Sequence, residues 1–157
     1  MRGNSAGERL MQGAAAGLAA TVPMTAVMEA LHRGLPARQR HPLPPRKITM
    51  RIAKKVGARH QLDASQRLAT TLAAHFGYGS AVGALLGAVA PRGAAKAAAA
   101  GAGFGLVVWA VSYLGLMPLL DLHRPATREP PGRNLLMIAA HLVWGATAGA
   151  VVDALRE

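Results

Sequence analysis

Two histidines stand in apolar stretches of the sequence and repeat one local pattern. His75 in HFGYGSAVG and His141 in HLVWGATAG are each followed by an aromatic residue three positions later and by glycines four and eight positions later. Histidine titrates near neutral pH, and ionisable side chains are costly in apolar surroundings. These two side chains are therefore the first candidates for chemistry, either as a proton or ion site or as polar groups that join helices.

Residues four apart lie on one face of a helix, so each histidine begins a stripe that continues through glycines. The stripes are His75, Gly79, Gly83 and Gly87; His141, Gly145 and Gly149; and, without a histidine, Ala97, Gly101, Gly105 and Trp109. Small residues at this spacing let helix backbones approach closely within a membrane. We therefore expect both histidines to face neighbouring helices and not lipid.

The apolar stretches that carry the stripes are long enough to cross a bilayer, which takes about 20 helical residues. There are four of them, over approximately residues 11–31, 68–90, 94–120 and 135–155. Charged residues are 16% of the chain, against about 25% in soluble domains. Cysteine is absent, which excludes disulfides and thiol chemistry. The sequence predicts an all-α, integral membrane four-helix bundle that forms a single domain over residues 1–157.

A basic, Pro-rich connection, residues 32–67, joins the first two spans and holds ten of the 18 Lys and Arg. Within it, residues 46–56 place Ile48, Ile52 and Val56 at four-residue spacing, which predicts an amphipathic helix at the membrane surface. Its cations, expected to meet anionic lipid headgroups, are Arg46, Lys47, Arg51, Lys54 and Lys55. PLPPR, residues 42–46, is expected to be extended. Nucleic acid is disfavoured as a partner because no aromatic residue is interleaved in this segment.

The positive charges also predict an orientation. The first and third connections carry thirteen Lys and Arg, whereas the opposite side carries five: Arg2, Arg9, Arg92, Lys96 and Arg156. The positive-inside rule places the more basic side in the cytoplasm and the termini outside.

Other ionisable residues end the spans on the side where both histidines lie. Seven or eight residues at 1.5 Å rise put each histidine about 10–12 Å below that surface. Glu29, Asp121 and His123 lie at span ends on the same side. His75, His141, Glu29, Asp121 and His123 therefore form a candidate proton or ion site, in which a carboxylate would favour a protonated histidine. The competing interpretation, which we favour, is that the histidines hydrogen-bond between helices as structural groups.

Enzyme chemistry and cofactor binding find little support. The sequence has no nucleophile elbow, HExxH motif or phosphate-binding loop. GAGFG, residues 101–105, lies within an apolar span and is better explained by packing. Two histidines without a close carboxylate make a poor metal site, and tightly packed glycine faces leave little room for a porphyrin. We expect no enzymatic activity, no cofactor and no metal.

Four stretches together carry a resemblance to a known family: PLPPR, HFGYG, LGAVAPRGAAKAAAAGAG and HLVWG. Their order and spacing over about residues 41–155 resemble the YagU-like inner-membrane proteins of bacteria, a family usually labelled a domain of unknown function. This chain differs in its third span, where Trp109 stands near a position that is histidine in the enteric member, and it lacks a long insertion after the Pro-rich motif. The resemblance implies a multi-pass protein of the bacterial inner membrane with a cytoplasmic C-terminus. That is opposite to the charge count, so the orientation stays open.

These observations together favour a small structural or accessory membrane protein, for which a histidine-based proton- or pH-responsive site is the second interpretation of the histidines. The alternative is an oligomeric channel or transporter subunit for protons or a small solute. The glycine stripes are compatible with packing inside one chain and with homo-oligomers.

Overall fold

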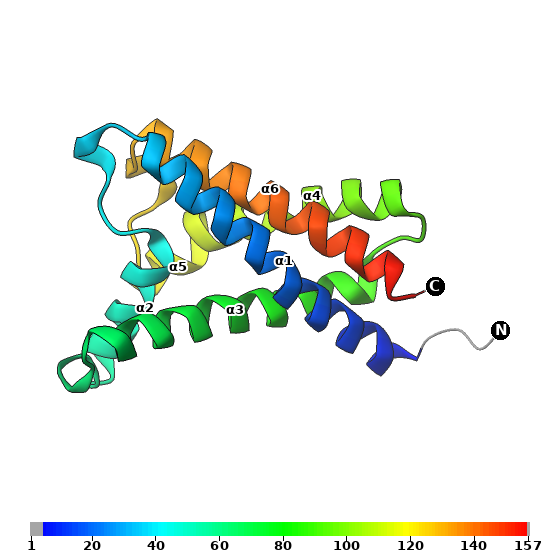
Figure 1. The fold of residues 1–157 in the computed structure, drawn as a ribbon, viewed down its shortest axis with the longest axis horizontal. Coiled ribbons are helices and arrows are strands. Elements are labelled where there is room, and N and C mark those ends of the chain that lie inside the picture. Colours follow the sequence, from blue (N-terminus) through cyan, green and yellow to red (C-terminus); the bar gives the residue numbers. More distant parts are fainter. Residues whose placement is uncertain (1–4, 157) are drawn as a thin grey trace.

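The computed structural model describes residues 5–156, and these form helices and turns without any strand. Arg2, one of the cations in the charge count, lies outside the described residues. Four helical segments are long and apolar enough to cross a membrane: α1 (Ala6–Gly34), α3 (Ala64–Val89), α4 with its continuation through α5 (Ala94–Leu119), and α6 (Pro131–Ala154). A shorter helix, α2 (Pro44–Lys55), lies in the first connection (Figure 1). The predicted all-α bundle of four membrane helices is confirmed.

Helix packing rests on two glycine-lined crossings. A Cβ added at Gly83 would meet the backbone of Gly13 and Gly17, so α1 and α3 touch backbone to backbone. A Cβ added at Gly145 would meet the backbone of Gly101 and Gly105, so α4 and α6 do the same. Such close approach lets dispersion contacts hold helices together where lipid removes the hydrophobic driving force. Packing of α1 on α6 then joins the two pairs.

Away from the α1–α3 crossing, α3 diverges from α6, as Figure 1 shows towards its left side. The basic connection returns into this wedge and places α2 against α3. On α2, Pro44, Thr49 and Ala53 are buried, while Arg46 and Lys54 stay exposed. A helix is therefore present where the amphipathic helix was predicted, but Pro44, Thr49 and Ala53 form the face buried on the bundle, whereas Ile52 and Val56 of the predicted apolar stripe are exposed.

The PLPPR segment corrects one expectation. We expected extended backbone over residues 42–46, but α2 already begins at Pro44; Leu43, the residue before it, is extended, with φ −63° and ψ 153°. Proline is favoured in the first turn of a helix because its missing N–H has no partner there in any case and its φ already suits the helix.

The third span also departs from one continuous α-helix. α4 (Ala94–Ala110) passes into a π-helical turn, Val111–Leu116, which is followed by α5 (Met117–Leu119). Pro118 in α5 lacks an N–H, and its ring crowds the carbonyl four residues earlier. Widening of the preceding turn relieves that conflict. The π turn brings Ser112 and Tyr113 to buried positions.

Candidate functional site

A cavity of about 190 Å³ lies in the wedge between the helices, beneath α2. Most of its lining is apolar, as is usual for binding cavities, and the polar side chains within it are few. The residues that the following paragraphs use are Thr21, Pro45, Ile48, Ile52, His75, Tyr78, Ser112, Tyr113, His141 and Trp144. Ile52 and Tyr78 are also exposed at the outer surface of the bundle, so the cavity borders the region that lipid would occupy.

His141 lies on the α6 wall of this cavity and is buried. Its Nδ1 is 2.7 Å from the carbonyl oxygen of Met137, one turn earlier. Because a carbonyl can only accept, Nδ1 carries the proton, and Nε2 of the neutral ring is left as an acceptor. The carbonyl of His141 itself lies against Gly105 at the α4–α6 crossing. The crossing thus fixes the backbone that presents the ring.

His75 lies on the α3 wall of the same cavity. Its Nε2 is buried and has no hydrogen-bond partner among the described residues. A buried polar atom without a partner costs free energy, and most such atoms in proteins are paired. This position therefore favours occupants that can donate or accept a hydrogen bond at Nε2.

Tyr78 and Ser112 close one side of the cavity with a hydrogen bond of 2.9 Å between their hydroxyls, which ties α3 to the π-helical turn. Next to it, Tyr113 meets the ring of His141 edge to face, with 5.9 Å between ring centroids. Tyr113 makes a second edge-to-face contact with His123, at 5.6 Å. One buried tyrosine thus bridges the cavity and the connection that follows α5.

Opposite these groups, the α1 wall is fixed by the carbonyl of Gly17. Thr21 donates its hydroxyl to this oxygen at 2.8 Å, and Trp144 of α6 donates its indole N–H to it at 3.1 Å. The indole ring of Trp144 lies on the cavity and is 3% exposed. Trp144 therefore links α1 to α6, and its fluorescence emission is expected to depend on the polarity of the cavity.

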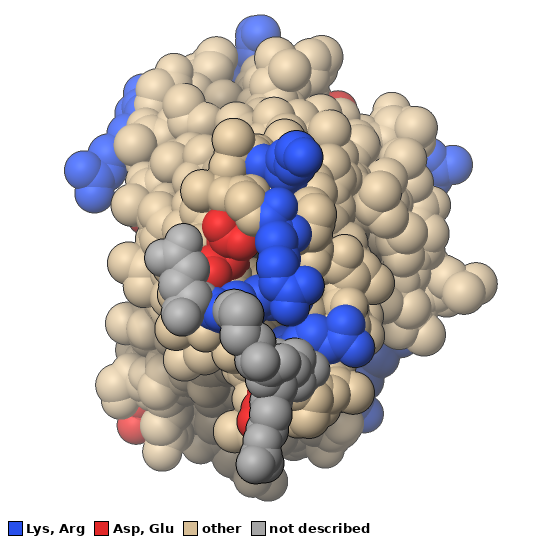
Figure 2. All heavy atoms as spheres, turned by 90° about the vertical axis from the view of Figure 1, so that its right-hand side faces the viewer, with Lys and Arg blue, Asp and Glu red and all other residues tan. Residues whose placement is uncertain are grey.

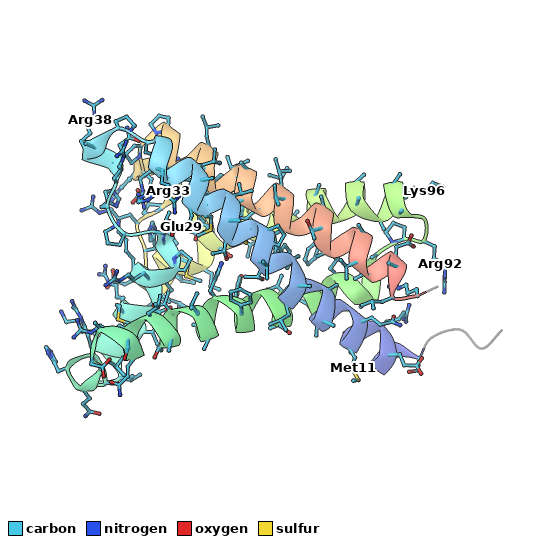
Figure 3. The ribbon with its side chains drawn as sticks, in the orientation of Figure 1. Met11, Glu29, Arg33, Arg38, Arg92 and Lys96 are labelled. Carbon is cyan, nitrogen blue, oxygen red and sulfur yellow. The ribbon has the colours of Figure 1, made fainter. Side chains whose placement is uncertain are left out.

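The structure brings together some of the predicted site residues and separates others. His75 and His141 line one cavity, and His123 contacts it through Tyr113. Glu29 is exposed near the end of α1, close to Arg33 (Figure 3). Asp121 is exposed and pairs with Arg51 at 3.0 Å. Neither carboxylate lies on the cavity wall.

The prediction that Glu29 or Asp121 would lie beside one of the cavity histidines is therefore wrong. Asp121 follows the end of α5 in a turn with φ 52°, which carries its side chain to the surface beside α2. Glu29 lies on a face of α1 other than the one that carries the buried Met24 and Met28. Among the described residues, no group of three or more His, Cys, Asp or Glu could hold a metal ion.

Sequence reasoning missed Ser112 and Tyr113 because it treated the third span as one continuous helix. The available signal was Pro118, which forces an irregular turn just before it. Tyr78 and Trp144 had been noticed as the aromatic residues three positions after each histidine. What that spacing did not show is that both side chains reach the same cavity.

Comparison with known proteins places this arrangement in a family. Residues 25–150 match the family described as a protein of unknown function, DUF1440. The chain belongs to this family. The match covers all cavity-lining residues outside α1, and it agrees with the resemblance to YagU-like proteins. No curated protein and no solved structure matches the DUF1440 chain.

Proposed function

We propose that this DUF1440 chain is a non-enzymatic accessory protein of the bacterial inner membrane whose histidine-lined cavity responds to protons. The observation that carries the proposal is that His75 and His141, which belong to different glycine stripes, lie on the walls of one mainly apolar cavity. Four helices that are long and apolar enough to span a membrane support the location.

Protonation would change this cavity because it adds a charge where none of the described residues of the wall is acidic. Neutral His141 donates through Nδ1 to Met137 and keeps a lone pair on Nε2. A protonated ring carries a positive charge and a second N–H donor that needs an acceptor. An uncompensated charge in apolar surroundings costs several kcal/mol, so we expect protonation to draw in water or displace part of the wall.

The wall best suited to move is α2. It is 12 residues long and covers the cavity with Pro45, Ile48 and Ile52. It also carries cations, which a protonated histidine beneath it would repel. Protonation is therefore expected to loosen α2 from the bundle and admit water to the cavity.

The natural tryptophans allow a direct test. The chain has two, so Trp109→Phe leaves Trp144 on the cavity wall as a single fluorophore. In lipid nanodiscs, we expect its emission to shift to longer wavelength between about pH 8 and about pH 4, a range that extends well below the usual histidine pKa of about 6.5. His75→Gln combined with His141→Gln should abolish the shift. His60→Gln, which changes an exposed histidine outside the cavity, should leave it intact.

Two results would contradict the proposal. A shift that persists in the double variant would assign the pH response to other groups. The other result combines two measurements. If Trp144 emission does not depend on pH in the protein that keeps both histidines, and the double variant folds but is less thermally stable, the histidines are structural links between helices. The channel or transporter alternative makes a separate prediction: liposomes containing the chain would then show proton flux that the double variant abolishes.

A further inference from the structure

A second hollow, of about 1070 Å³, lies on the surface at the end of the bundle where α2 is found, and it is strongly basic. Its walls come from α2 and the residues just before it, from the connection between α2 and α3 with the start of α3, and from the connection between α5 and α6. The Lys and Arg that line it are Arg46, Lys47, Arg51, Lys54, Arg59, Arg67, Arg124 and Arg128. Segments far apart in the sequence thus converge to concentrate positive charge in one place.

The acidic side chains near this basic hollow are already engaged. Glu129, which lines it, forms an ion pair of 3.3 Å with Arg133, whose side chain is 4% exposed. Asp121 forms the ion pair with Arg51. These are the two ion pairs that the described residues form. The other cations of the hollow have no acidic partner in the described part of the chain, so an anion is the complementary ligand.

The half-buried Lys47 and the buried His123 at the basic hollow bear on the charge of its ligand. Lys47 Nζ lies 2.8 Å from His41 Nδ1. The pKa of Lys47 is lower than usual, mainly because the amine is partly buried and secondly because the positive charge of Arg133 repels it. His123 is 7% exposed, lines the hollow, and has a buried Nε2 without a hydrogen-bond partner among the described residues. An anion in the hollow would relieve the repulsion between cations. His123 would donate to it through Nε2 only when the ring is protonated, because Nδ1 already donates to the carbonyl of Arg124 at 2.7 Å.

The surroundings of the basic hollow favour a lipid over a soluble anion. The two long connections join the spanning segments at this end of the bundle. A bilayer crossed by these four segments would therefore have its headgroups at the level of the hollow. Large apolar side chains are exposed on the segments that line it, including Val56, between Lys54 and Arg59, and Leu119, which is 83% exposed and lies three residues before Leu122. Helix α2 separates the two sites: Ile48 lines the cavity, whereas Arg46 lines the hollow.

We propose that the basic hollow binds the headgroup of an anionic phospholipid that carries two phosphates. One phosphodiester carries a single negative charge, so a headgroup with two phosphates matches twice as many of the surrounding cations. Two phosphates joined by a short linker can engage α2 and the α5–α6 connection at once, and the second contact then forms at a high effective concentration. Basic pockets beside membrane helices are suited to such headgroups. This inference does not depend on the proton response of the cavity.

The test uses the full chain in detergent, with thermal unfolding followed as lipid is added. The probes are cardiolipin, phosphatidylglycerol at equal phosphate concentration, and inorganic pyrophosphate. We expect cardiolipin to raise the unfolding temperature at concentrations at least about tenfold lower than phosphatidylglycerol, because charge-assisted hydrogen bonds add across both phosphates. Pyrophosphate should have little effect, since it lacks acyl chains to hold it at the membrane surface.

Paired variants separate this site from general surface charge. Arg124→Gln with Arg128→Gln removes two exposed cations of the hollow. Arg92→Gln with Lys96→Gln removes two exposed cations at the opposite end of the bundle, as Figure 3 shows. Figure 2 looks onto that opposite end, where Lys and Arg form a narrow line on a mostly uncharged face. Both pairs lower the net charge equally. We expect the first pair to weaken cardiolipin binding about tenfold and the second to leave it unchanged.

Three outcomes would overturn the proposal. If cardiolipin and phosphatidylglycerol raise the unfolding temperature equally at matched phosphate concentration, the hollow has no preference for a headgroup with two phosphates. Equal losses in the two paired variants would show that binding follows net charge and not the hollow. Stabilisation by pyrophosphate as strong as that by cardiolipin would make the ligand a soluble phosphate.

Discussion

The close approach of α4 and α6 makes Gly145→Ala an informative change. The added methyl carbon would lie 2.7 Å from the carbonyl carbon of Gly101 and 3.1 Å from Cα of Gly105, and it would also meet the carbonyl oxygen of Gly101. Every one of these neighbours is backbone, so no side-chain rotation can make room. The two helices must separate, which weakens their contacts along the whole crossing.

Gly103→Ala is the matched control, because nothing lies within 4 Å of a Cβ at that position. Both glycines are inside helices, so the gain in helix propensity from alanine is similar and cancels in the comparison. The difference in unfolding free energy then isolates overpacking, which costs about 1–3 kcal/mol. Unfolding in mixed detergent micelles measures it. If Gly145→Ala proves as stable as Gly103→Ala, the backbone contact between α4 and α6 is not what holds this pair together.

Two further predictions concern the basic end of the bundle. Arg133 donates to the carbonyls of Gln39, His41 and Pro42 and pairs with Glu129 while almost fully buried. Arg133→Gln should cost about 3–5 kcal/mol because it leaves Glu129 unpaired, whereas the exposed Arg128→Gln should change stability by less than about 0.5 kcal/mol; chemical unfolding of both variants checks this. Burial lowers the pKa of His123 below its usual 6.5, so on acidification the unfolded chain takes up the proton first and stability falls as the pH drops below about 6.5. His123→Gln should flatten that dependence in unfolding measured at several pH values, and an unchanged slope would assign it elsewhere.

Much of the fold could be read from the sequence because apolar length and small-residue spacing are local properties. The four spans, the basic connection and the amphipathic helix within it follow from residue types over windows of about 20 residues or fewer. The stripe through Gly145 and Gly149 could likewise be recognised by its four-residue spacing. Gly13 and Gly17 in α1 have that spacing too, and their contact with α3 could have been anticipated from it.

The candidate site depended on information that is not local. The prolines of PLPPR suggested extended backbone, yet two of them open α2, since the first turn of a helix tolerates proline. The effect of Pro118 on the turn before it decided that Ser112 and Tyr113 would line the cavity. Asp121 pairs with Arg51 across a long separation in sequence, and the spacing of residues along the chain could not reveal that pairing.

The sequence by itself determined that this is an all-helical membrane bundle, that its helices meet through glycines, and that two histidines lie within apolar spans. The tertiary structure alone decided that α1 pairs with α3 and α4 with α6, so that a wedge opens between α3 and α6. A glycine stripe has no side chains that select a particular partner, so any one of these stripes could pack against any other. Which stripes meet depends on the crossing geometry of the whole bundle, and that choice places His75 and His141 on one cavity.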